Sequence, residues 1–170
     1  MKAVSNTTPL IYLSKSSLLP LLKTLHQSVL ISKEVYEEAV IKGESRGYKD
    51  ALSIKDAAND WIQVKKVAGD VFLHLMDRMH RERLDEVIKS LGGLSEADVS
   101  TIALAIEEKA DRVILDDRAA IKAAKLIADV CSFKVIGTGN LIDEGLEKGY
   151  ISKSDYERFV KIIGHAAYAA

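Results

Sequence analysis

The sequence has one cysteine, two prolines and no apolar run that approaches the ~18 residues of a membrane span. Cys131 cannot form an intramolecular disulfide, and a lone thiol is compatible with a reducing compartment. We interpret it as a small buried apolar residue. The N-terminal segment becomes polar before a signal-length apolar stretch forms, so the predicted location is the cytoplasm.

Neither sign of charge predominates. The chain has 24 Lys and Arg against 25 Asp and Glu, a net charge of −1. It therefore lacks the global basic field that drives non-specific nucleic-acid binding, and any contact with a polyanion must use a local patch. Because 48% of the residues are apolar, disordered and low-complexity classes are excluded. The length of 170 residues fits a single domain spanning 1–170.

Short β-branched runs alternate with longer amphipathic segments along the chain. This alternation predicts an α/β fold with three layers, a central parallel sheet and helices on both faces. The expected strands lie at residues 3–5, 29–31, 61–64, 113–115 and 134–136. The strand at 113–115 must lie inside the sheet, and not at its edge, if the acids that follow it are to reach a central site.

Capping residues and apolar spacing predict the helices. Thr8 is expected to cap the first helix, with Pro9 in its first turn, and Ser95 is expected to cap a helix whose first turn is acidic. The other expected features are a helix start at Pro20, a helix from Ser32 to Lys42-Gly43, a loop at 43–49, a projecting helix or helical pair at 71–91, and a terminal helix from Ser154 to about His165.

Acidic residues gather after the predicted strands. Asn6 follows the first strand, Glu37 and Glu38 lie on the helix after the second, and Glu96, Asp98, Asp116 and Asp117 begin later helices or follow a strand. Ligands of open α/β sheets bind beyond the carboxyl ends of the strands, and converging carboxylates there need a cation, a proton or arginines. Mg²⁺ or Mn²⁺ prefers such oxygen ligands. Helix capping and solvation explain the same acids without a metal and are favoured by spacing alone, and both interpretations stay open at this point.

A rival motif is Gly137-Thr138-Gly139, which follows a predicted strand and opens a helix. The third glycine of a dinucleotide site would be residue 142, which is Ile142. We therefore predict an ordinary strand-to-helix turn.

Four segments in order resemble the PIN domain, and in particular the prokaryotic PIN-like group related to VapC toxins. They are Ser5-Asn6-Thr7-Thr8-Pro9-Leu10-Ile11, Val35-Tyr36-Glu37-Glu38, Leu94-Ser95-Glu96-Ala97-Asp98 and Ile114-Leu115-Asp116-Asp117-Arg118. The resemblance implies a metal-dependent ribonuclease in which acids hold Mg²⁺ or Mn²⁺ and activate water on RNA. It also implies a homodimer and, for a toxin, a small antitoxin protein as partner.

The family's four metal-binding positions fall on Asn6, Glu38, Asp98 and Asp117, with Glu37, Glu96 and Asp116 as neighbouring alternatives. The resemblance assigns the catalytic role to Glu38, Asp98 and Asp117. Its accompanying hydroxyl falls on Thr7, with Thr8 as the alternative. The departure is Asn6, whose amide oxygen can bind a cation but adds no charge. The alternative function is therefore a catalytically weakened PIN-like module that binds RNA or protein.

A local basic patch is expected beside these acids. Arg118, Lys122 and Lys125 have the spacing i, i+4 and i+7, which places them on one helix face. That face is predicted to hold RNA phosphates, and a solvated surface is the simpler alternative. Lys15 and the cluster Arg78, Arg81 and Arg83 are weaker candidates, the cluster because acids intersperse it.

Overall fold

The computed structural model describes residues 1–164 and contains the predicted parallel sheet. Its strands are β1 (Lys2–Ser5), β2 (Ser28–Ser32), β3 (Ile62–Lys65), β4 (Arg112–Ile114) and β5 (Lys134–Ile136). They lie in the order β3-β2-β1-β4-β5, and each neighbouring pair is parallel. All five predicted strands are confirmed within two residues. Because β4 lies between β1 and β5, it is an interior strand, as the placement of Asp116 and Asp117 requires.

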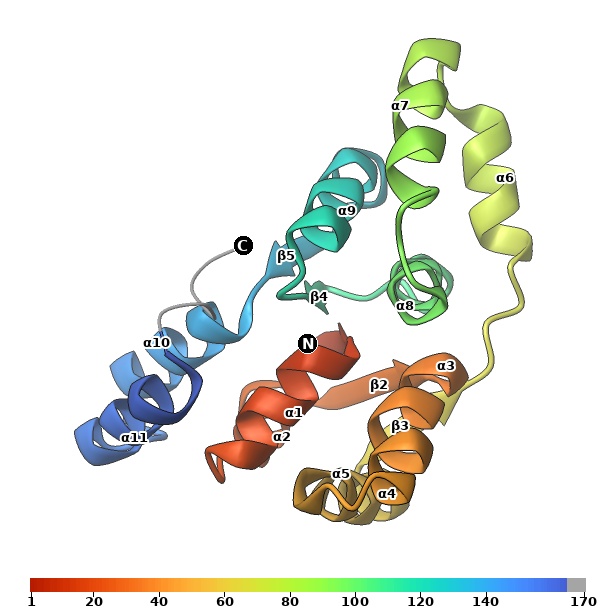
Figure 1. Ribbon diagram of the computed structural model, residues 1–170. Helices are drawn as coiled ribbons and strands as arrows, with labels where there is room; N and C mark the ends of the chain where they lie inside the picture. Colours follow the sequence, from red (N-terminus) through yellow and green to blue (C-terminus); the bar gives the residue numbers. More distant parts are fainter. Residues whose placement is uncertain (165–170) are drawn as a thin grey trace.

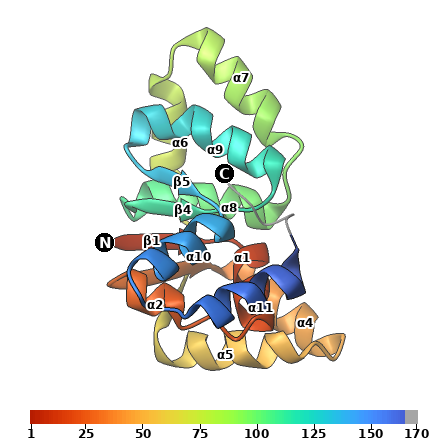
Figure 2. The same ribbon diagram turned by 90° about the vertical axis from the view of Figure 1, so that its left-hand side faces the viewer.

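Successive strand residues point to opposite faces of the sheet, and the two faces have separate apolar cores. On β1, Ala3 belongs to one core and Val4 to the other. Figure 2 shows the resulting layers, with α6–α9 on one side of the strands and α1, α2, α5, α10 and α11 on the other. The three-layer α/β/α prediction is thus confirmed.

The helices on the Ala3 side are α1 (Thr7–Lys15), α2 (Leu21–Leu25), α5 (Lys49–Asp60), α10 (Thr138–Glu147) and α11 (Lys153–Ile163). Those on the Val4 side are α6 (Asp70–Arg78), α7 (Arg81–Leu91), α8 (Glu96–Glu107) and α9 (Arg118–Cys131). Between β2 and α5, the chain forms α3 (Lys33–Tyr36), a π-helical turn η1 (Glu37–Ile41) and α4 (Lys42–Ser45). The predicted pair at 71–91 is confirmed as α6 and α7, which stand out beyond α8 and α9 (Figure 1).

Three sequence-based expectations are wrong in detail. Helix α1 begins at Thr7, so Asn6 and not Thr8 occupies the N-cap position. The helix after β2 continues to Ser45 and α5 begins at Lys49, so the loop predicted at 43–49 is confirmed only at residues 46–48, where Gly47 has a φ of +72°. Cys131 is half-buried and not fully buried, and burial raises the pKa of its thiol. Terminal helix α11 is confirmed, whereas His165 lies outside the described residues.

Gly43 lies within α4 at the point where α4 packs against α5. A Cβ on Gly43 would lie 2.8 Å from the Cβ of Ala51 on α5. Only a residue without a side chain lets α4 and α5 approach this closely, so the glycine marks close packing and not a loop.

Gly43→Ala is expected to lower the free energy of unfolding by about 1–2 kcal/mol, because the new methyl group overpacks the α4–α5 contact. Urea denaturation measures the change. Gly93→Ala is the control, since nothing lies within 4 Å of a Cβ at Gly93. Equal stability of the two variants would contradict the packing role of Gly43.

No helix within residues 1–164 is both long and apolar enough to cross a membrane.

Candidate functional site

The carboxyl ends of β1 and β4 bring the first candidate residues to one edge of the sheet. The backbone N–H of Asn6 donates to the carbonyl oxygen of Ile114 at 3.1 Å. This bond extends the β1–β4 ladder by one residue, so Asn6 lies beside the segment that continues into Asp116 and Asp117. The sheet topology therefore places these three positions at the same edge.

Asn6 contacts the candidate acid of α8 directly. The Asn6 Nδ2 donates to Asp98 Oδ1 at 2.6 Å, and the Asn6 Oδ1 accepts a long bond of 3.4 Å from Thr101 Oγ1. Asn6 is buried, whereas Asp98 is half-buried. An amide can donate to the carboxylate, whereas a carboxylate at position 6 would repel it. Asn6 therefore satisfies Asp98 without a cation.

Because its side chain bonds Asp98, Asn6 does not cap helix α1 with a hydrogen bond. Asn6 is the N-cap residue of α1, yet its side chain makes no capping hydrogen bond. An N-cap side chain normally accepts from the N–H of the second or third helical residue, and the third is Pro9, which has no N–H. One of the two usual capping donors is thus missing, so turning the Asn6 amide toward Asp98 costs α1 little.

Asp98 is held by its own helix as well. Its Oδ2 accepts from the Ser95 backbone N–H at 3.1 Å and from the Ser95 hydroxyl at 2.7 Å, while Ser95 Oγ accepts from the Asp98 N–H at 3.1 Å. These bonds form a capping box, which confirms Ser95 as the predicted N-cap. The capping interpretation and the site interpretation therefore apply to different oxygens of one carboxylate.

Asp117 has the same double character. Its Oδ1 accepts from the backbone N–H groups of Ala119 and Ala120, both at 2.9 Å, and thereby caps α9. Its Oδ2 has no hydrogen-bond partner within the described residues, and the side chain is exposed. One oxygen of Asp117 is thus free to bind a ligand.

Asp116 turns toward the start of α10. Its Oδ1 accepts from the Thr138 backbone N–H at 2.7 Å, and its Oδ2 accepts from the Thr138 hydroxyl. Burial raises the pKa of the Asp116 carboxyl, and the two bonds from Thr138 partly offset that rise. Both oxygens are therefore occupied. Thr138 was not predicted as a site residue, although it follows β5 at the same sheet edge.

The acids on the segment after β2 differ in their exposure to solvent. Glu38 and Glu37 lie on the π-helical turn with exposed side chains, and Glu96 at the start of α8 is exposed too. Glu34 on α3 is the half-buried one, and its Oε2 is buried without a hydrogen-bond partner among residues 1–164. A hydrogen bond joins Asn6 to Asp98, whereas no hydrogen bond within residues 1–164 joins either residue to Glu38.

The comparison with protein families covers nearly the whole chain. The family model DUF3368, described as a PIN domain, matches residues 2–163. The chain belongs to the PIN-domain family. The predicted resemblance is thereby confirmed at the level of the family. No curated protein matches the chain.

The donor atoms of this PIN domain fit a hard divalent cation in type. They are oxygens of Asn6, Asp98 and Asp117, and the neighbouring Thr7 Oγ1 is buried with no hydrogen-bond partner in residues 1–164. The charged donors are fewer than a typical metal centre offers. Within the described residues, no group of three or more Asp, Glu, His or Cys side chains stands close enough to hold a metal ion. The oxygen donors thus suit Mg²⁺ or Mn²⁺. The Asn6 amide, however, already satisfies the Asp98 oxygen that a cation would otherwise neutralise.

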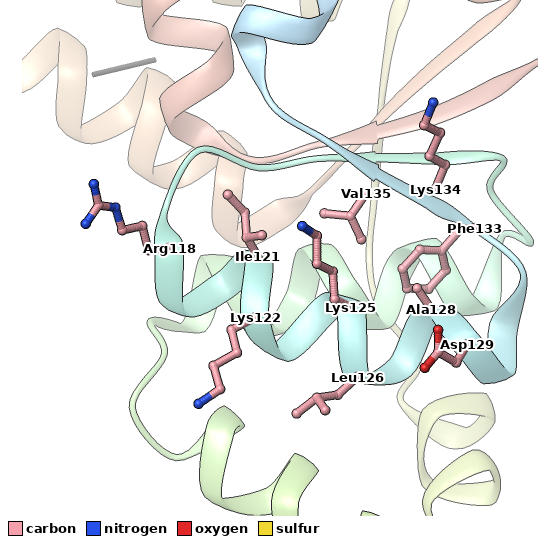
Figure 3. Close-up of a pocket in the computed structure, with 10 residues that line it drawn as sticks. All are labelled: Arg118, Ile121, Lys122, Lys125, Leu126, Ala128, Asp129, Phe133, Lys134 and Val135. Carbon is pink, nitrogen blue, oxygen red and sulfur yellow. The ribbon is translucent and has the colours of Figure 1, made fainter. Parts of the chain in front are cut away.

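The predicted basic face of the PIN domain continues from Asp117. Arg118 and Lys122 lie on α9 with Lys125, and none of the three side chains has an ion-pair partner in the part of the chain that the structure describes. Figure 3 shows all three on the same helix. Unpaired cations next to a candidate acid are suited to phosphate groups.

Proposed function

We propose that this PIN domain is a divalent-metal-dependent endoribonuclease with weak affinity for its metal. The observation that carries the proposal is the position of Asn6, Asp98 and Asp117 at the carboxyl edge of β1 and β4, in a chain that matches the PIN family over residues 2–163. The edge carries oxygen ligands, and unpaired cations follow directly on α9. Metal-dependent cleavage of a phosphodiester needs oxygen ligands to hold the metal and cations to position the phosphate.

The metal, Mg²⁺ or Mn²⁺, would be held by Asn6 Oδ1, the Asp98 carboxylate and the free Oδ2 of Asp117. The further acids are Glu38 and Asp116, of which Asp116 would have to exchange a bond from Thr138 for the metal. When bound, such an ion supplies a water of lowered pKa and positive charge beside the phosphate. Ser95 fixes the orientation of Asp98, and the α9 amides fix Asp117. Catalysis is assigned to Glu38, Asp98 and Asp117, and phosphate positioning to Arg118, Lys122 and Lys125.

The second candidate function is a non-catalytic RNA-binding module, and the Asn6–Asp98 bond favours it. That bond satisfies the Asp98 carboxylate with a neutral donor at 2.6 Å. A metal must therefore displace a short bond to a charged group, and such bonds contribute about 1.5–3 kcal/mol. The basic face of α9 needs no metal to hold RNA.

The two candidates differ in the result of one experiment. Labelled single-stranded RNA is incubated with Mn²⁺ and either the native protein or the variants Asp98→Asn and Asp117→Asn. The nuclease proposal expects Mn²⁺-dependent cleavage that each substitution abolishes, since each removes a charge from the metal site. Asn retains the ability to cap α9 at position 117, so that loss of activity would not reflect unfolding.

Binding of the RNA without cleavage at any Mn²⁺ concentration would support the non-catalytic module. Cleavage that persists in both variants would indicate a contaminating nuclease or another site, and would overturn the assignment.

The resemblance to VapC toxins adds two finer proposals. We propose that the protein acts as a toxin restrained by a small antitoxin protein, and that it forms a homodimer. A monomeric mass in solution at micromolar concentration would contradict the dimer. Growth that is unaffected by expression of the native chain would contradict the toxin.

A further inference from the structure

We infer that the pocket between α3, α8 and the start of α6 binds a small organic cation, a linear aliphatic diamine. The pocket has a volume of about 560 Å³. Its walls come from these three helices and from the connection between β3 and α6, which passes along the outer side of α3 and α8 (Figure 1). The volume lies within the range of pockets for small molecules.

Glu34 of α3 gives the pocket an unpaired negative charge. Its side chain is half-buried and lies in the pocket wall, its Oε2 is buried without a hydrogen-bond partner among residues 1–164, and its carboxylate takes part in no ion pair there. A carboxylate that loses water without gaining a donor costs free energy. A cation that enters the pocket lies beside this charge and offsets that cost.

The rest of the lining is largely apolar, which determines the kind of cation. A hydrated metal ion gains nothing from an apolar wall and needs several oxygen ligands, and no group of three acids, histidines or cysteines that could supply them occurs within the described residues. An organic cation gains free energy from the same wall, because its carbon chain leaves water. The apolar residues of the lining are Val67, Phe72, Leu94, Val99 and Ala103.

A second acid in the lining favours a ligand with two positive charges. Glu96, at the start of α8, is exposed, whereas Glu34 is half-buried. The lining contains no Lys, Arg or His side chain. Two acids in one apolar pocket complement two ammonium groups joined by methylene groups. A linear diamine therefore fits better than a single amine, whose one charge would leave one of the acids without a partner.

Glu107 of α8 fixes the outer wall of the pocket. Its carboxylate accepts from the backbone N–H of Ala68 at 3.0 Å and from that of Gly69. These two bonds hold the connection between β3 and α6 against α8, with Val67 in the lining. The pocket is therefore formed before a ligand enters, and binding does not have to order this segment.

The test is a titration of the ¹⁵N-labelled protein with cadaverine in EDTA, followed by the shifts of the amide signals in NMR spectra. We expect saturable binding with a dissociation constant of about 1 mM or lower. The largest shifts are expected at Gly69 and Val99, which line the pocket. Glu34→Gln keeps the shape of the side chain but removes the charge, and should weaken binding by about tenfold or more.

Two further variants complete the test. Val99→Phe fills the pocket without changing its charge and should also weaken binding, since Val99 is half-buried in the lining. Glu157→Gln removes the same kind of charge as Glu34→Gln, at an exposed position of α11 on the opposite face of the sheet. Its affinity for cadaverine should equal that of the native protein.

Native affinity in Glu34→Gln would overturn the assignment, because the unpaired carboxylate would then not bind the ligand. Equal affinity for pentanol would overturn it too, since charge would then play no part. Shifts confined to Ala119 and Ala120, whose amides bond Asp117, would place the cation at the proposed metal site instead. Because the titration contains neither RNA nor Mn²⁺, its outcome does not depend on the nuclease proposal.

Discussion

Asn6→Asp is expected to raise the affinity for Mn²⁺ by about tenfold or more and to increase any RNA cleavage. The reason is the short contact between the Asn6 amide and the Asp98 carboxylate, 2.6 Å between Nδ2 and Oδ1. In the variant a second carboxylate faces Asp98 at that position. The site then has one more negative charge to attract a divalent cation in a partly buried cleft, and the cation no longer competes with the amide hydrogen bond.

The same substitution is expected to destabilise the metal-free protein by about 1–3 kcal/mol. It replaces a favourable bond to a charged group by repulsion between two acids, which must then share a proton or separate. The loss of stability therefore depends on metal: Asn6→Asp is less stable than the native protein in EDTA, and Mn²⁺ restores part or all of the difference.

Calorimetric titration of Mn²⁺ and thermal unfolding with and without the ion measure both effects. Asn59→Asp, at an exposed position of α5, adds the same charge away from the site and should change neither quantity. Equal Mn²⁺ affinity in native protein and Asn6→Asp would show that Asn6 does not belong to a metal site. High cleavage activity of the native protein would show that the amide oxygen suffices.

The sheet was predictable because each strand is short, β-branched and followed by a helix pattern. The residues after β1 and β4 were predictable as site candidates for the same reason, since parallel strands end at one edge. The loop predicted at 43–49 was too long because Gly43 was interpreted as a helix end, whereas it accommodates Ala51 of α5, and the connection is confined to residues 46–48. The signal for α5 was present in the spacing of Ala51, Ile54 and Ala57, all of which are buried.

The hydrogen-bond partners of the individual carboxylate oxygens could not be predicted from the sequence. Asp98 was expected both as a cap and as a ligand, and only the structure shows that Oδ2 serves Ser95 while Oδ1 faces Asn6. Asp116 and Asp117 are adjacent in sequence, yet one binds Thr138 and the other caps α9 with a single oxygen. Such choices depend on backbone direction after a strand, which composition and spacing do not record.

Ion pairs between residues far apart in the sequence could not be predicted from it either. Arg83 was a weak candidate because acids surround it in sequence, but in space it neutralises Asp129 of another helix. Arg112 at the start of β4 pairs with Glu144 of α10 across 32 positions, and Lys148 bonds the same carboxylate one turn along the helix. Removal of the Arg112–Glu144 ion pair is expected to change stability in a pH-dependent way.

Glu144→Gln is expected to lower the free energy of unfolding at neutral pH by about 2 kcal/mol. Burial acts to raise the pKa of Glu144, but bonds from Arg112 and Lys148 outweigh it and lower that pKa from 4.5 to about 2. The full shift corresponds to roughly 3 kcal/mol, and solvent at the partly exposed pair screens some of it. The carboxylate is charged more readily in the folded state than in the unfolded state. Its contribution is therefore complete above about pH 5 and is lost as the pH falls toward about 2.

Urea denaturation at a series of pH values measures this dependence as the difference between the native protein and Glu144→Gln. That difference should be largest near neutral pH and should shrink steadily between about pH 5 and pH 2, because the protonated glutamic acid resembles glutamine. Glu147→Gln, on the exposed side of the same helix, has no ion pair within the described residues and should follow the native profile. A native–Glu144→Gln difference that stays constant over the whole range would mean that Arg112 does not stabilise the charged form of Glu144.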